Sequence, residues 1–169
     1  RDDKEMYRLL FESANDAIFL MDVDQFVACN SKTLEMFGCA VKEDIVGRAP
    51  TDFSPPEQPG GRPSREQAME YITAALEGKP QRFPWKHCRK DGTPFDSEVS
   101  LTAVVLDGKP HLLSIVRDLT EKTQAELVQN AVYQISQAAD EASSLEELYP
   151  AVHRIIGTVM PALNFYIAI

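Results

Sequence analysis

The chain has 169 residues, of which 44% are hydrophobic and 25% are charged, as in a globular protein of one domain plus a further fragment. Its 17 Lys and Arg against 26 Asp and Glu give a net charge of −9, which argues against nucleic acid as a partner. No apolar run approaches the roughly 20 residues that cross a bilayer, so we expect a cytoplasmic fragment without direct membrane contact.

The first forty residues predict a helix, a hairpin and a second helix. Apolar residues at helical spacing over 6–14 indicate a short amphipathic N-terminal helix. The runs 17–22 and 25–30 read as two strands joined by a turn at Val23-Asp24. The next helix is expected to start at a cap, Asn30 or Ser31, and to run through Phe37 to Gly38.

Two helical segments and a loop are predicted over residues 42–78. A short helical turn is expected at 42–45, and the four prolines and two glycines of 54–63 predict a loop. Ser64 followed by Gln67 is a capping-box pattern, which opens a helix that reaches Leu76.

Three strands follow, with tight turns expected at Asp91-Gly92 and Asp107-Gly108. Alternation places one set of side chains on the inner face of these strands: Phe83, Trp85, His87, Val99, Leu101 and Ala103. The last strand covers 111–116. Five strands with helices between the second and third predict an α+β fold with an antiparallel sheet.

At residues 117–121 the strand pattern gives way to a long helix without Gly or Pro. The Thr120 hydroxyl is placed to cap this helix, and Glu121 puts a negative charge in its first turn. A rigid strand that leads into a rigid helix can transmit a small displacement. We therefore predict that Arg117, Asp118 and Thr120 form a signal relay.

The helix over 121–142 carries an apolar stripe whose members are spaced by three and four residues: Val128, Ala131, Ile135, Ala138, Ala142 and Leu145. Such a stripe must be buried, either by packing within its own chain or in a parallel two-stranded coiled coil. We favour a homodimer through this linker helix, because the fragment after it offers no complete core.

Two blocks of sequence resemble bacterial PAS sensor domains of the PAS/PAC (S-box) type. The run 83–101 (FPWKHCRKDGTPFDSEVSL), followed by IVRDLTE at 115–121, resembles the C-terminal half of the family. The runs 14–19 and 29–38 resemble its opening strands and first helix. The resemblance implies a PAS domain over 1–120, with a five-stranded antiparallel sheet, short helices on one face, a small cavity and a following signalling helix.

Residues 143–169 resemble the beginning of a GAF domain, cut short by the end of the sequence. Ser144 to Gly157 looks like its first helix, and Met160 to Ile169 looks like its first strand. A fragment of this length cannot bury a core of its own, so its apolar strand must pack on something else. Arg1 in place of an initiating Met likewise indicates a piece of a longer protein, which leaves an upstream membrane anchor open.

The family resemblance and the alternation together predict a ligand-binding cavity. Its candidate lining residues come from the helices and the sheet: Phe37, Phe53, Met69, Ile72, Leu76, Trp85, Val99, Leu101 and Leu113. Trp85 is predicted to be a wall and core residue; non-covalent flavin, or a small carboxylate or amide ligand, is the alternative. The ligand is unknown.

The cofactor patterns of the family are not matched. Haem-binding members carry a His as iron ligand at a position that falls near Gln67, and residues 64–78 contain no His. Photoreactive flavin-binding members place a Cys in an Asn-Cys-Arg-Phe-type run, whereas Cys29 and Cys39 stand in other contexts. The sequence therefore argues against haem and against a photoreactive flavin.

Metal binding and catalysis are not predicted either. His87, Cys88 and His111 would need a further ligand and a favourable register, and the three cysteines show no C-x-x-C spacing. Motifs of serine hydrolases, phosphate-binding loops and zinc proteases are not found in the sequence. We expect no catalytic residues in this fragment.

The predicted function is that of a sensory module in a multidomain bacterial signalling protein, such as a two-component system. It would bind a small ligand or dimerise, and would relay the change through Asp118-Leu-Thr120 into the linker helix. The helix would then control a histidine kinase or a diguanylate cyclase. The alternative is a ligand-free PAS module for interaction and dimerisation.

Overall fold

The computed structural model describes residues 2–160, and the chain divides between Leu119 and Thr120 into two compact units. The predicted α+β fold is confirmed in the first unit. Its elements in chain order are α1 (Asp2–Ser13), β1 (Ala17–Asp22), β2 (Gln25–Cys29), α2 (Ser31–Phe37), the 3-10 helices η1 (Lys42–Asp44) and η2 (Pro50–Phe53), α3 (Ser64–Leu76), β3 (Gln81–Cys88), β4 (Pro94–Leu106) and β5 (Lys109–Asp118).

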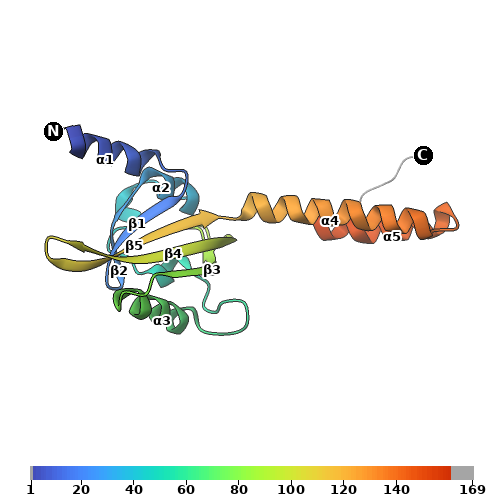
Figure 1. Ribbon diagram of the computed structural model, residues 1–169. Coiled ribbons are helices and arrows are strands. Elements are labelled where there is room, and N and C mark those ends of the chain that lie inside the picture. Colours follow the sequence, from blue (N-terminus) through green and yellow to red (C-terminus); the bar gives the residue numbers. More distant parts are fainter. Residues whose placement is uncertain (1, 161–169) are drawn as a thin grey trace. The chain divides into compact units, whose positions relative to one another are not determined.

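The five strands form one antiparallel sheet (Figure 1), in the order β2-β1-β5-β4-β3. The first and last strands are therefore neighbours at the centre, and β3 is an edge. The register places Ser114 of β5 opposite both Phe19 of β1 and Leu101 of β4. Side chains in register on neighbouring strands share a face, so these three belong to one face of the sheet.

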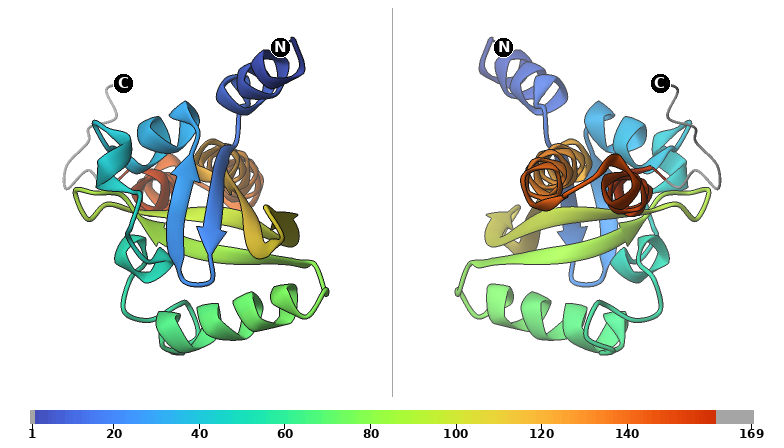
Figure 2. Two further views of the ribbon diagram at one scale, coloured as in Figure 1. Left: turned by 90° about the vertical axis from the view of Figure 1, so that its left-hand side faces the viewer. Right: turned by 90° about the vertical axis from the view of Figure 1, so that its right-hand side faces the viewer.

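That face carries the hydrophobic core. α3 lies across it, and α2 and η2 complete the cover (Figures 1 and 2). Phe37 of α2 makes edge contacts with Phe19, Phe53 and Phe95, at ring-centroid distances of 5.4 to 5.5 Å. Such offset and edge arrangements are the favoured ones for aromatic pairs, so Phe37 is a hub of the core.

Asn30 connects α2 to the N-terminal part of the unit. It is fully buried, and its Oδ1 accepts hydrogen bonds from the Ile18 and Thr33 backbone N–H groups at 3.0 and 3.1 Å. Its Nδ2 donates to the carbonyl oxygens of Phe11 and Asp16 at 3.0 and 3.1 Å. Of the two predicted caps, Asn30 is therefore the one that the structure uses.

Two features of the middle segment differ from the sequence-based prediction. η2 was not expected, because its four residues are too few to show a period. The capping box at the start of α3 does not form: the Ser64 hydroxyl donates to the Pro55 carbonyl and accepts from Gln58 Nε2, so it does not cap the helix. The Ser64 hydroxyl therefore holds the loop before α3 in place and does not cap the N-terminus of α3.

The second unit is a pair of helices, α4 (Thr120–Glu141) and α5 (Leu145–Val159), which lie side by side (Figure 2). Ser144 caps α5 by accepting a hydrogen bond from the Glu147 N–H at 3.3 Å. None of the helices within residues 2–160 combines the length and hydropathy that a membrane crossing requires.

The predicted stripe of α4 lies partly against α5. Ala131 is 8% exposed and Ile135, Ala138 and Ala142 are half-buried, whereas Val128 is 45% exposed. Leu145, the last predicted member, is instead the first residue of α5 and is 58% exposed. Packing within the chain thus covers much of the stripe, which was the alternative to a coiled coil. The homodimer stays a prediction, and the strand predicted at 160–169 lies beyond the last described residue, Met160.

Candidate functional site

A cavity of about 50 Å³ lies between the inner face of the sheet and the helices that cover it. Its lining is mostly aromatic and aliphatic: Phe19, Met21, Phe26, Phe37, Pro50, Phe53, Ala68, Ile72, Phe83, Trp85, His87, Val99, Leu101, Ser114 and Val116. A water molecule occupies about 30 Å³ of liquid volume and drug-sized ligands need roughly 300–1,000 Å³. As folded, the cavity accommodates a ligand of only a few non-hydrogen atoms.

The structure gathers six of the nine predicted lining residues around this cavity: Phe37, Phe53, Ile72, Trp85, Val99 and Leu101. Their inward direction follows from strand alternation and from the helical period of α3. Ligand binding by these residues stays a prediction.

Met69, Leu76 and Leu113 are not in the cavity wall, which corrects their placement. On α3 the inward residues are Ala68, Ile72 and Ala75, so Met69 turns aside and is 41% exposed. Leu76 packs against the core at the end of α3 without reaching the cavity. On β5 the inward positions are the even-numbered ones, so Leu113 is on the opposite face.

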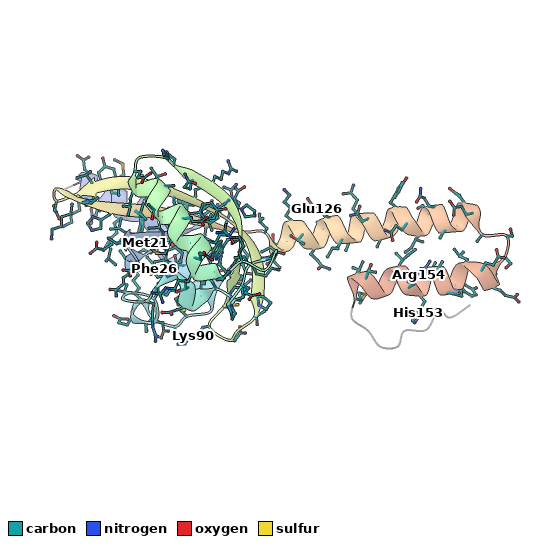
Figure 3. All side chains as sticks on the ribbon, turned by 90° about the horizontal axis from the view of Figure 1, so that it is seen from below. Met21, Phe26, Lys90, Glu126, His153 and Arg154 are labelled. Atoms are coloured by element: carbon teal, nitrogen blue, oxygen red, sulfur yellow. The ribbon has the colours of Figure 1, made fainter. Side chains whose placement is uncertain are left out.

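Several lining residues were not predicted as cavity residues, among them Met21 and Phe26, which Figure 3 labels. Both come from the β1–β2 hairpin, where Phe19, Met21 and Phe26 are all at most 5% exposed. The sequence carried no alternation that could identify them, because residues 17–21 of β1 are all apolar; the pairing of β1 with β5 decides that the odd-numbered ones face inward.

Trp85 is a wall residue, as predicted, and its indole N–H donates to the Ser54 hydroxyl at 3.0 Å. Neither a haem nor a flavin ring system fits a cavity of about 50 Å³ with these side chains in place.

His87 is the titratable group of the cavity wall, 8% exposed and set between Phe37 and Phe95. Its Nδ1 lies 2.7 Å from the Ser97 hydroxyl oxygen, and that hydroxyl donates its hydrogen to the Trp85 carbonyl at 2.7 Å. Since Ser97 has only one hydrogen to donate, Nδ1–H must be the donor to Ser97. Nε2 is then the acceptor nitrogen of the ring.

Burial lowers the pKa of His87 to about 3, with the negative charge of Asp118 acting weakly in the opposite direction. The ring is therefore neutral at physiological pH. His111 is near the β4–β5 turn, bonded to the Lys109 carbonyl, so it does not approach His87. Across residues 2–160 no three His, Cys, Asp or Glu side chains converge as a metal site would require.

The end of β5 is tied to the cavity wall through Arg89. The Arg89 guanidinium forms an ion pair with Asp118 at 2.9 Å and also donates to the Met36 carbonyl. Its central carbon lies 4.2 Å from the centre of the Phe95 ring, and Phe95 stacks on His87 at 5.6 Å. A continuous set of contacts thus runs from the cavity wall to Asp118.

The other predicted relay residues, Arg117 and Thr120, are the sequence neighbours of Asp118 and Leu119. Arg117 forms an exposed ion pair with Asp16 at 2.9 Å, and the Leu119 N–H donates to the Asp96 carbonyl at 2.9 Å. Thr120 is the first residue of α4. Arg89 was missed, although its position directly before the Lys90-Asp91-Gly92 turn was the signal that could have identified it.

A protein-family model described as "PAS domain" matches residues 15–121. A curated protein of Methanosarcina acetivorans, the methyl sulfide methyltransferase-associated sensor, is 27% identical over 131 residues. This match covers 76% of the chain and 12% of the relative, so the chain spans only a small part of that protein's length.

Solved structures share the fold at low sequence identity. The PAS domain of a protein from Colwellia psychrerythraea is 20% identical, with a TM-score of 0.60 over 71% of this chain and 99% of that one. The PAS domain of an HTR-like protein from Haloarcula marismortui is 22% identical, with a TM-score of 0.59 over 69% and 92%. A LOV protein of Rhodobacter sphaeroides is 19% identical, with a TM-score of 0.58 over 94% of both chains.

Proposed function

This chain belongs to the PAS domain family, and on that premise we propose that it is the sensory module of a longer bacterial signalling protein. A small ligand in the cavity, or dimerisation, changes the first unit. The join at Asp118, Leu119 and Thr120 passes the change into α4, and α4 controls a histidine kinase or a diguanylate cyclase. The chain itself has no catalytic role in this proposal.

The observation that carries the proposal is the set of contacts from His87 through Phe95 and Arg89 to Asp118. Each member touches the next, and Asp118 is the last residue of the strand that precedes α4. A ligand that displaces the His87 or Phe95 ring must therefore also move Arg89 or weaken its pairing with Asp118.

Such a relay needs two arrangements of the join. A ligand shifts their populations only as far as its affinity differs between them. Closely packed interiors favour discrete alternatives over gradual deformation. The stacked rings and the ion pair provide a place where two discrete arrangements can differ.

For the second unit we propose two roles. α4 is a dimerisation helix, because its Leu127, Val128 and Val132 side chains are 41 to 59% exposed beside the α5-covered stripe. α5 is the first helix of a GAF domain, in keeping with its Ser144 cap and apolar face. A homodimer would bury the exposed side chains of α4.

One observation favours the alternative function, a ligand-free PAS interaction module. The cavity of about 50 Å³ is small, so the core is nearly filled by its own side chains. A sensor that responds only to partners needs no larger space.

The two functions can be separated by filling the cavity. We would combine Val99→Ile and Val116→Ile, each of which adds one methylene group to the wall, and measure hydrogen exchange of the amides of residues 118–125. The sensory proposal expects altered exchange there, and Val105→Ile, at a side chain that is 73% exposed, is the matched control. Unchanged exchange in a folded double variant would contradict coupling between cavity and join and support the ligand-free module.

A further inference from the structure

Gln67 of α3 has a carbonyl oxygen in an unusual position. Within the part of the chain that the structure describes, Oε1 of Gln67 is the buried side-chain acceptor without a hydrogen-bond donor. Such groups are rare in folded proteins and call for an explanation. The sequence singled out Gln67 twice, as half of a capping box and as the position of a family iron ligand, and the capping box does not form.

Gln67 lines a second pocket, separate from the central cavity, with a volume of about 270 Å³. We call it the β3 edge pocket. It is formed by the loop before α3, by α3, by the ends of β3 and β4, and by the join: Gln58, Pro59, Gln67, Tyr71, Pro84, Trp85, Lys86, Asp96, Ser97 and Leu119.

The wall of this pocket is fixed by hydrogen bonds of the edge strand. Gln58 accepts from the Lys86 N–H at 2.8 Å and donates to the Lys86 carbonyl at 3.0 Å, so its amide pairs with β3 as a further strand would. Gln58 is 5% exposed and also donates to Ser64. A wall held in this way is formed before a ligand arrives, which lowers the entropic cost of binding.

The chemistry of the wall defines the kind of ligand. Tyr71 stacks on Phe83 at 3.6 Å and 3°, and it meets Trp85 edge-on at 6.5 Å, so one side of the pocket is aromatic. Lys86 and Asp96 form an ion pair at 2.9 Å, so these two side chains give the pocket wall no net charge. An aromatic wall without net charge suits a planar, uncharged molecule.

We propose that the β3 edge pocket binds a small planar carboxamide, whose N–H donates to the Gln67 carbonyl oxygen. The proposal requires the Gln67 amide to turn its buried oxygen toward the pocket, whose wall Gln67 forms in part. At the packing density of protein interiors, about 0.75, the pocket of about 270 Å³ holds about 200 Å³ of ligand. A benzene ring that carries one amide group fits within this volume.

The site lies next to the join and shares Trp85 with the wall of the central cavity. Leu119, which separates Asp118 from α4, is in its wall and is held there by the bond from its N–H to the Asp96 carbonyl. An occupant of the pocket contacts Leu119 directly. The proposal thus adds a second input to the sensory module and does not depend on a ligand in the central cavity.

The test compares three probes of nearly the same shape on the whole chain: benzamide, which donates N–H; acetophenone, which does not; and benzoate, which is charged. Backbone amide shifts of Gln67, Lys86 and Leu119 report occupancy, and Trp85, the single Trp of the chain, gives an independent fluorescence signal. Because benzamide alone can donate a hydrogen bond to Gln67, we expect it to bind about fivefold tighter than acetophenone. Benzoate should bind most weakly.

Gln67→Met keeps the length of the side chain and removes the amide. We expect this variant to fold with an unchanged or higher melting temperature, and to bind benzamide and acetophenone equally. The proposal is overturned by equal binding of the two probes to the wild-type chain, by a benzamide preference that survives in Gln67→Met, or by no binding. Shifts that gather at Phe19 and Val116 would place the probes in the central cavity and overturn it as well.

Discussion

Arg89 and Asp118 form an ion pair of 2.9 Å that joins the β3–β4 turn to the last residue of β5. Their side chains are 25% and 26% exposed, so the pair is only partly screened by solvent. Arg89 also covers Phe95 and donates to the Met36 carbonyl. One side chain therefore connects the core, α2 and the strand that leads into α4.

Arg89→Met tests this connection. The variant keeps the apolar stem over Phe95 but removes the charge and both hydrogen bonds, so we expect a loss of about 2 kcal/mol of stability. Hydrogen exchange at Leu119 and in the first turn of α4 should become faster, while the central strands stay protected. Arg82→Met, which breaks the more exposed pair with Glu98, should cost less than about 1 kcal/mol and leave the join unchanged.

The two faces of the sheet can be distinguished by truncation. Leu101→Ala removes a cavity-wall side chain that is 4% exposed, and we expect a loss of about 2–5 kcal/mol, measured by urea denaturation. Leu113→Ala, on the opposite face, removes the same atoms from a half-buried site and should cost about half as much. Equal losses would mean that Leu113 is as deeply packed as Leu101.

Most of the fold could be predicted from the sequence because its signals are local. The hairpin turn at Val23-Asp24, the stop at Gly38 and the bounds of α3 depend on neighbouring residues, and the structure has them where the pattern placed them. Which residues of β5 face inward could not be predicted from the local sequence. Its residues 112–116 are apolar except for Ser114, and only pairing with β1 and β4 decides which of them face inward.

The candidate site was predictable in part for the same reason. Trp85, Val99 and Leu101 follow from alternation in strands. The contact of Arg89 with Asp118 bridges 29 positions, and the bond of Trp85 to Ser54 bridges 31, so neither leaves a periodic signal. The capping box at Ser64 is an example of a local motif that is present in the sequence but does not form. The Ser64 hydroxyl donates to the Pro55 carbonyl, nine residues away, and does not cap the helix.

Asn30→Asp is expected to be among the most damaging single changes. The carboxylate keeps the acceptor oxygens but replaces the amide that donates to Phe11 and Asp16, which leaves a buried negative charge facing two carbonyl oxygens. We expect a loss of about 3 kcal/mol or more at neutral pH, measured by thermal unfolding. Ser31→Ala, at the neighbouring exposed position, is the control and should cost about 1 kcal/mol or less. Comparable losses would contradict the role of the Asn30 amide.

The proposed dimer can be tested at α4. Val132 is 59% exposed, so Val132→Glu should not disturb the packing of α4 on α5, but it should dissociate a dimer that buries this stripe. Sedimentation equilibrium of the wild-type chain and of this variant measures the change, with Gln129→Glu as a charge-matched control. A wild-type chain that stays monomeric at high concentration would contradict dimerisation through α4.

His87→Phe should remove a specific part of the pH dependence of stability. The pKa of His87 is lowered from its ordinary value of 6.5 to about 3, so between these values the unfolded chain binds a proton that the folded chain does not. The contribution of His87 is therefore fully present above pH 6.5 and is lost as the pH falls toward 3. For one group the slope is at most about 1.4 kcal/mol per pH unit.

The measurement is the free energy of unfolding by urea between pH 7.5 and 5, a range above the ordinary carboxyl pKa values. Phe preserves the ring contacts with Phe37 and Phe95, and the Ser97 hydroxyl keeps its bond to the Trp85 carbonyl, so the variant should fold. We expect the wild-type chain to lose stability over this range and His87→Phe to lose markedly less. Parallel pH profiles would show that the pKa of His87 is not lowered in the folded chain, and would contradict the neutral ring described above.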